Sequence, residues 1–410
     1  MHIHIGILHI EVSQKLRLDM LRLPLTLRRK IMAKIMTIKT EKKKKPVGLW
    51  VYIAIAVPPA LLTLIYYIFQ HNSNAMDWIS AHISAPIRSA LGFYSSLFPL
   101  KFFSVAEVLC TAAALWCVYH IATTVVKISR RKNKLKILGK RAYVLGVFAL
   151  YALCCFNWLW GVGYFESSFA AKNDIEVAGV SVADLTASAQ HFLEKANELA
   201  PLVTRDSDGH YAEDIDSMIA ASDGIYAALE KEFQTLEGIH YPPKKMMYSK
   251  AMSRLGFTGF YFALTGESNI NAAAPAFLLP ATIAHELAHQ RGINAEEEAN
   301  FAGIAACITS GNPVYEYAGY VDGLIHTMNS LYSADYDAWS EIRKGFCFEL
   351  ETDWQDNNEY WAAQKTDEGI GGAVNTFYDG YLKAYGQELG IKSYGACVDL
   401  LVSWDRGRLS

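Results

Sequence analysis

Three long apolar stretches in the first half of the chain constrain its fold more than any other feature. Residues 47–69 contain 23 residues without a charged side chain. At a rise of about 1.5 Å per residue, a helix of that length crosses a bilayer. Two further apolar runs follow at residues 108–126 and 142–162. We therefore expect three transmembrane helices, with the remaining residues folded outside the membrane.

Charge divides the sequence at the end of the third apolar run. Residues 1–162 carry 22 Lys and Arg against 5 Asp and Glu, whereas residues 163–410 carry 16 against 36. This division predicts a basic membrane domain over residues 47–162 and an acidic soluble domain over residues 163–410. The acidic half argues against a nucleic acid partner, because phosphate binding needs Lys and Arg.

Basic residues also predict the orientation of the helices. They cluster in the leader, residues 1–46, and in residues 127–141, which carry eight of them. By the positive-inside rule, both segments are cytoplasmic, so residues 70–104 and the soluble domain lie outside the cell membrane. The spacing of apolar residues within 70–104 favours an amphipathic helix on the membrane surface. The leader is expected to be disordered, or to start upstream of the true first residue.

The chemistry of the soluble half centres on the motif His285-Glu286-Leu287-Ala288-His289. On a helix, which we expect over residues 278–291, the two histidines lie one turn apart on one face and can hold a zinc ion together. Glu286 then lies where it can take a proton from a water molecule that zinc activates. We predict Zn²⁺ as the cofactor, His285 and His289 as ligands, and Glu286 as the general base.

A third zinc ligand is expected from a second helix that begins near residue 296, where Glu296, Glu297 and Glu298 follow one another. Glu296 is preferred, because it shares a helix face with Asn300, which could hydrogen-bond a ligand imidazole. The same stretch resembles the Glu-x-x-Ala-Asp third-ligand motif of membrane-associated zinc peptidases. All three carboxylates remain candidates.

The rest of the soluble half is predicted to be mainly helical. Helical patterns of apolar residues cover residues 182–199, 215–229, 314–333, 335–364, 370–388 and 393–404. Residues 256–264 are rich in aromatic side chains and predict a strand or hairpin, whose edge could receive an extended peptide beside the motif helix. The predicted fold class is thus mainly α, with three transmembrane helices and a zincin-like domain that contains a small β element.

Two features of the soluble half stay open at this stage. A donor for the reaction's oxyanion could be any of four residues that follow the motif, namely Tyr315, Tyr317, Tyr320 and His326. Three cysteines, Cys307, Cys347 and Cys397, are an odd set without metal-binding spacing, and one pair of them could form a disulfide.

Several sequence blocks resemble a family of bacterial membrane proteins catalogued as domain-of-unknown-function 3810. The blocks are residues 103–107, 265–271, 285–292, 296–301, 375–378, 381–383 and 392–395. The resemblance covers roughly residues 48–405. The family is uncharacterised and supplies no substrate, but its motif implies a zinc peptidase and supports the predicted architecture and metal site.

We therefore expect a membrane-anchored, extracytoplasmic zinc metallopeptidase of the gluzincin type, acting on an envelope or extracellular peptide or protein. The alternative is a non-catalytic membrane-anchored sensor or scaffold that keeps the zincin-like fold. Replacing Glu286 by Gln separates the two: cleavage is lost with zinc retained in the first case, and nothing changes in the second. Transport is disfavoured, because the spans offer too few ionisable groups for a pathway.

Overall fold

The computed structural model describes residues 24, 26–27, 48–130, 133–175, 177, 179–364, 372, 376, 380–381, 383, 385 and 394–409. The predicted leader and the predicted helix over residues 370–388 lie largely outside this set. The chain separates into two units, Met1–Ile55 and Ala56–Ser410, and the contacts reported below lie within the second. Of the described residues, 73% lie in helices and 4% in strands, which confirms the prediction of a mainly α protein with a small β element.

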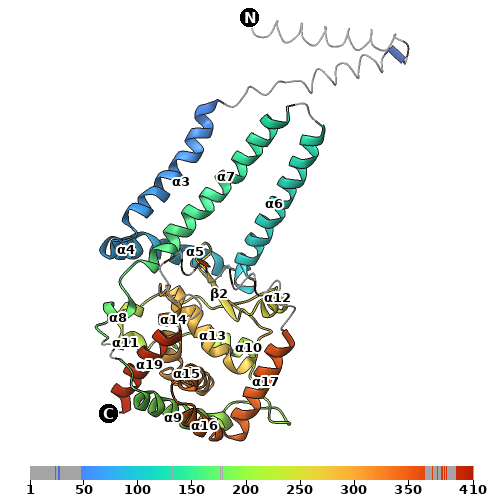
Figure 1. The fold of residues 1–410 in the computed structure, drawn as a ribbon. Helices are drawn as coiled ribbons and strands as arrows, with labels where there is room; N and C mark the ends of the chain where they lie inside the picture. The colour runs from blue at the N-terminus through green and yellow to red at the C-terminus, as the bar shows by residue number, and fades with distance from the viewer. Residues whose placement is uncertain are drawn as a thin grey trace, which may run out of the picture. The chain divides into compact units, whose positions relative to one another are not determined.

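Three helices of the described part are long and apolar enough to cross a membrane (Figure 1). They are α3 (Leu49–Phe69), α6 (Val105–Arg130) and α7 (Lys134–Leu159), as predicted from the apolar runs. Their surfaces expose large apolar side chains: Leu115 and Val118 of α6 are each 65% exposed. Such surfaces are costly in water and match the lipid environment of a bilayer.

The connection between α3 and α6 is helical, as its amphipathic pattern predicts. It contains α4 (Ser73–Ile79), a π-helical turn (Ser80–Ser84), α5 (Ala85–Ser96) and a 3₁₀ turn (Leu100–Phe102). The buried side of α5 carries Arg88, whose Nη1 donates to the Leu159 carbonyl oxygen at 2.9 Å. This bond satisfies a carbonyl at the end of α7, so the connection packs against that end of the helix.

The second half of the chain has a helical core (Figure 1). Its central helices are α9 (Val182–Leu199), α13 (Leu279–Gln290), α14 (Glu296–Ile308), α15 (Pro313–Ala334) and α19 (Tyr394–Leu409), which pack against one another. Shorter helices surround them: α8 (Phe169–Lys172), α10 (Ile215–Ala221), α11 (Leu229–Glu232), α12 (Ser249–Arg254), α16 (Tyr336–Lys344) and α17 (Phe348–Gln364).

Glycine interrupts two of the helices predicted from periodicity. The pattern over residues 215–229 is broken where Gly224 adopts a φ of +86°, a conformation that ends helices. The pattern over residues 335–364 is broken at Gly345, where a side chain would lie 2.7 Å from the Leu193 Cδ2. In both cases the apolar spacing continues across the break, which explains why periodicity alone predicts one long helix.

The predicted strand is confirmed as part of a small sheet. Strands β2 (Gly259–Phe262) and β3 (Glu267–Ile270) form an antiparallel hairpin, and β1 (Lys244–Lys245) pairs with β3 in parallel. The strand order β1-β3-β2 leaves β2 at an edge, and α13 packs against both β2 and β3. All seven cysteines, each within the described part of the chain, are free.

Candidate metal centre

Helices α13 and α14 bring His285, His289 and Glu296 together. Glu296 Oε2 lies 3.4 Å from His285 Nε2 and 3.8 Å from His289 Nε2. Donors bound to one tetrahedral zinc at about 2.0–2.1 Å stand roughly 3.4 Å apart, so the spacing fits such an ion. Among the residues that the structure describes, this is the one group of three or more His, Cys, Asp or Glu side chains that could hold a metal.

The backbone after α13 orients His289. Gly292 adopts a φ of +99°, which turns the chain back toward the helix it has just left. The Ile293 carbonyl oxygen then lies 2.6 Å from His289 Nδ1, leaving Nε2 directed at Glu296. Asn300, expected in this orienting role and itself among the described residues, makes no hydrogen bond to either imidazole. A local backbone carbonyl holds the ring instead.

Small residues bring α14 against α13 at the candidate metal ligands. A side chain at Gly303 would lie 2.9 Å from the His285 backbone nitrogen, so only glycine permits this approach of the two helices. It places Glu296, in the first turn of α14, beside the histidines. Glu298 points elsewhere and accepts a hydrogen bond from the Phe169 backbone nitrogen at 2.6 Å. Of the three successive acids, Glu296 is the one that faces the imidazoles.

Glu296 and the imidazoles affect each other electrostatically. Burial alone lowers the pKa of His285, but the Glu296 carboxylate outweighs burial and raises this pKa to about 9. Burial likewise disfavours charge on Glu296, yet the two imidazoles hold its pKa well below the ordinary value. The site therefore favours an anionic Glu296 beside a protonated His285, and a bound metal cation would have to displace that proton, because only a neutral imidazole binds a metal.

Glu286 lies in the same helix turn but faces the sheet. Its side chain is buried, with 3% of the residue exposed, and Oε2 has no hydrogen-bond partner among the described residues. A side chain at Gly259 of β2 would lie 2.6 Å from Glu286 Oε1, so a bare backbone is needed there. Burial raises the pKa of Glu286 to about 7, against the opposing effect of His285 and His289. A buried carboxyl that titrates near neutrality suits proton transfer.

The donors predicted from sequence lie mostly away from this centre. The Tyr315 hydroxyl donates to the Met218 carbonyl oxygen at 2.7 Å and the Tyr317 hydroxyl to Asp353 at 2.5 Å, both in the core. Tyr320 packs on the rings of His191 and Phe192. The fourth candidate, His326, lies buried 4.0 Å from Asp322 and within electrostatic range of His285.

A cluster of aromatic side chains borders the centre, and the sequence analysis missed it. The Trp160 ring lies 5.3 Å from the His289 ring, edge to face. Its Nε1 is 3.2 Å from the Tyr164 hydroxyl and 3.1 Å from the Tyr381 hydroxyl, and Tyr381 donates to Tyr164 at 3.0 Å. Burial raises the pKa of Tyr381, and Glu296 adds to the rise, which places this hydroxyl within electrostatic range of Glu296, a candidate metal ligand.

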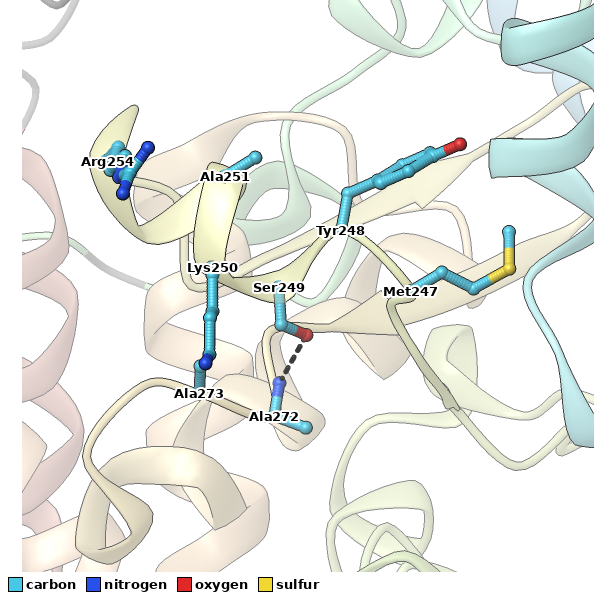
Figure 2. Close-up of a pocket in the computed structure, with 8 residues that line it drawn as sticks. All are labelled: Met247, Tyr248, Ser249, Lys250, Ala251, Arg254, Ala272 and Ala273. Carbon is cyan, nitrogen blue, oxygen red and sulfur yellow. Dashed lines mark hydrogen bonds between the residues drawn. The ribbon is translucent and has the colours of Figure 1, made fainter.

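Two cavities lie outside the three-ligand cluster. The larger, of about 530 Å³, is formed by α12 and the residues around it: Met247, Tyr248, Ser249, Lys250, Ala251, Arg254, Ala272 and Ala273 (Figure 2). The smaller, of about 170 Å³, is lined by Glu297 and Glu298 among others. Neither of these two cavities is lined by His285, His289 or Glu296.

Comparison with known proteins identifies one relationship. Residues 80–402 match the sequence model of a family described as "Protein of unknown function (DUF3810)". The match covers both the candidate spans α6 and α7 and the metal centre. No curated protein and no solved structure matches the chain.

Proposed function

This chain belongs to the family described as protein of unknown function (DUF3810), and we propose that it is a membrane-anchored zinc metallopeptidase. The observation that carries the proposal is the convergence of His285, His289 and Glu296 beside the buried Glu286, on a helix that packs against an edge strand. The three candidate spans support the membrane anchor. The charge pattern of the sequence supports a cytoplasmic N-terminus and an extracytoplasmic C-terminal domain.

The donor set supports zinc in a catalytic site. Two imidazoles and one carboxylate are borderline and hard donors that suit Zn²⁺, and no cysteine contributes. Structural zinc sites use four protein ligands, whereas three leave one position for water or substrate. Zinc held here would supply Lewis-acid activation of a water molecule and of the substrate carbonyl.

Glu286 has the position of the proton carrier. Glu286 is the residue directly after the proposed zinc ligand His285, so its carboxyl would lie close to a water molecule on the zinc. We assign it to take the proton from the attacking water and to return it to the amine that leaves. The unpartnered Oε2 supports this role, because a buried carboxylate oxygen with no internal partner is costly unless a ligand or water meets it.

The edge of β2 offers the place for an extended peptide. Its outer backbone groups are free of strand partners, since β2 pairs on one side only. A peptide that adds as a further strand gains main-chain hydrogen bonds and passes Gly259, against which the Glu286 carboxyl lies. We further assign the Tyr164–Tyr381 hydroxyl pair to stabilise the oxyanion, because Tyr381 lies within electrostatic range of Glu296.

Metal content and cleavage test this function in sequence. The full-length protein, purified in detergent, is analysed for zinc by plasma mass spectrometry beside His289→Ala, Glu296→Ala and the control Glu297→Gln. We expect near-stoichiometric zinc in the wild type and the control, and loss in the other two. A zinc-loaded sample is then tested on a peptide library against Glu286→Gln, which should keep zinc and lose cleavage.

Two results would contradict the proposal. A folded wild-type protein that binds no zinc, even when zinc is supplied, would exclude the peptidase and leave the sensor or scaffold. Equal cleavage by the wild type and Glu286→Gln would remove Glu286 from the reaction. Zinc retained in Glu296→Ala but lost in the control would move the third ligand to Glu297.

A further inference from the structure

We propose that the substrate is a polypeptide anchored in the same bilayer, cut within a few residues of the membrane surface. This inference rests on the proposed peptidase function and on α6 and α7 crossing the membrane. It concerns a different property, namely which polypeptides can reach the site. It is carried by the way in which the ends of the two spans are joined to the metal centre.

The end of α7 contacts the ligand helix directly. Trp160 follows Leu159, the last residue of α7, and its ring lies 5.3 Å from the His289 ring. The buried Asn294 donates to the Trp160 carbonyl oxygen at 2.8 Å, and Arg88 donates to that of Leu159. The metal ligands therefore lie about one side chain away from the end of a candidate span.

The beginning of α6 is joined to the sheet by a buried carboxylate. Glu267 of β3 accepts hydrogen bonds from the backbone nitrogens of Val105 at 3.2 Å and Ala106 at 2.7 Å, which caps the helix. Lys244 of β1 is ion-paired with Glu267 and donates to the Ser95 carbonyl oxygen at 2.6 Å. Charged hydrogen bonds in a buried setting make this a firm attachment.

A second carboxylate completes this attachment. Glu107, in the first turn of α6, accepts from the backbone nitrogens of Met247 at 2.6 Å and Tyr248 at 3.0 Å. Both residues immediately precede α12 and follow β1. The sheet is thus fastened to α6 at two points, and its position relative to the end of the span is set by backbone hydrogen bonds.

The register of the hairpin gives the distance from span to site. Phe262 pairs with Glu267, the residue that caps α6, and Gly259 pairs with Ile270 and lies against Glu286. The two ends of β2 are three residues apart, or roughly 10 Å at about 3.3 Å per residue. The free edge of β2 therefore begins near the start of α6 and leads to Glu286, the proposed general base. A peptide leaving the bilayer there meets Glu286 after about three or four residues.

The surface around the start of α6 matches the interfacial region of a bilayer. Exposed aromatic side chains gather just before α6, with Phe98 76% and Phe102 69% exposed. In the larger cavity, Met247 and Tyr248 point toward α6 (Figure 2), and the Tyr248 hydroxyl lies 3.2 Å from Thr111 Oγ1. Aromatic residues favour the headgroup level, so a folded soluble substrate would meet lipid here before it met β2.

Reporter geometry tests this inference without altering the enzyme. The zinc-loaded full-length protein is reconstituted into phosphatidylethanolamine–phosphatidylglycerol vesicles. Reporters carry one randomised peptide segment, joined to a single transmembrane anchor through a Gly/Ser spacer of about 5 or about 40 residues. A third reporter lacks the anchor. Cleavage rates are measured and cut positions mapped by mass spectrometry, with Glu286→Gln as the inactive control.

We expect the short-spacer reporter to be cut about 10-fold faster than the long-spacer one, because effective concentration falls with spacer length beyond the span to be bridged. Both anchored reporters lie in the same membrane as the enzyme. The ratio of their cleavage rates therefore reports the distance of the cut segment from the bilayer, and not merely the presence of the reporter in the membrane. Equal rates for short, long and unanchored reporters would overturn the inference while leaving the peptidase intact. If the zinc-loaded protein cuts none of the three reporters, both the proposed peptidase function and this inference are contradicted.

Discussion

Two clusters of charged side chains, one around Glu267 and one around His285, His289 and Glu296, have their polar atoms satisfied in different ways. In the first, Glu267 receives two backbone N–H groups, the Thr265 hydroxyl and the Lys244 ammonium. In the second, three donor atoms of His285, His289 and Glu296 face one another, and Glu286 Oε2 meets no partner among the described residues. The first cluster has both carboxylate oxygens of Glu267 occupied within the protein, whereas the second leaves Glu286 Oε2 for a ligand or a water molecule.

The difference distinguishes charged groups that stabilise the fold from charged groups that we propose to bind a metal or to react. A buried ion pair whose every oxygen is occupied holds α6 to the sheet and has nothing left to offer a ligand. In the second cluster the imidazoles and the Glu296 carboxylate stabilise each other, and their donor atoms stand at a spacing where a metal cation could replace the proton between them. We therefore expect substitutions in the Glu267 cluster to change the stability of the fold. Substitutions in the cluster of His285, His289 and Glu296 should change metal binding and the rate of cleavage.

The largest effect is expected for Glu286→Gln. Because the amide cannot accept a proton from water, cleavage should fall by about a thousandfold. Zinc content should stay near stoichiometric and the unfolding temperature should not fall, since Glu286 Oε2 has no hydrogen-bond partner among the described residues to lose. Cleavage assays, metal analysis and thermal unfolding are measured on one preparation. Lower stability in this variant would place Glu286 in the structural class and break the comparison.

The reverse pattern is expected for Glu267→Ala. Removing this carboxylate leaves the Lys244 ammonium buried without its partner and two N–H groups of α6 uncapped, at a cost of about 3–5 kcal/mol. Glu267→Gln keeps an acceptor and should lose less. Thermal unfolding in detergent measures both. An unchanged unfolding temperature in Glu267→Ala would show that the joint at α6 does not contribute to stability.

Removal of zinc should lower stability by an intermediate amount. At a free zinc concentration about 100 times the dissociation constant, binding stabilises the folded protein by about 3 kcal/mol, which a chelator removes. The wild type and Glu267→Gln should both respond to the chelator, whereas His289→Ala should not. A response in His289→Ala equal to that of the wild type would indicate that zinc binds elsewhere in the chain.

The smallest effect is expected for Tyr381→Phe. Loss of the hydroxyl that donates to Tyr164 and orients this hydroxyl pair should slow cleavage by about a hundredfold, while zinc content and unfolding temperature remain near wild type. Tyr385→Phe serves as the matched control, because the Tyr385 hydroxyl hydrogen-bonds Asn157 at the end of α7. Equal rates in the two variants would remove Tyr381 from the reaction and leave it as part of the aromatic packing around Trp160.

Local features of the structure were predictable from the sequence. The three apolar helices follow from uninterrupted apolar length, and the helix that carries His285 and His289 follows from their spacing of four residues. The strand over residues 259–262 follows from its aromatic composition. Each of these features depends on residues that are neighbours in the chain, so the spacing of residue types in the sequence matches the repeat of the helix or strand that they form.

The sequence by itself therefore determined which residues are candidates for a metal site and which helices are apolar enough for a membrane. Tertiary structure decided everything that joins distant segments: that Glu296 and not Glu298 faces the imidazoles, that Ile293 holds His289, and that Tyr381 lies near the ligands while Tyr317 does not. Only the fold brings Glu267 to the start of α6. The periodicity of apolar residues indicates which side of a helix or strand is buried. Contacts between residues that are distant in the sequence depend on how the elements pack, and no local sequence pattern specifies them.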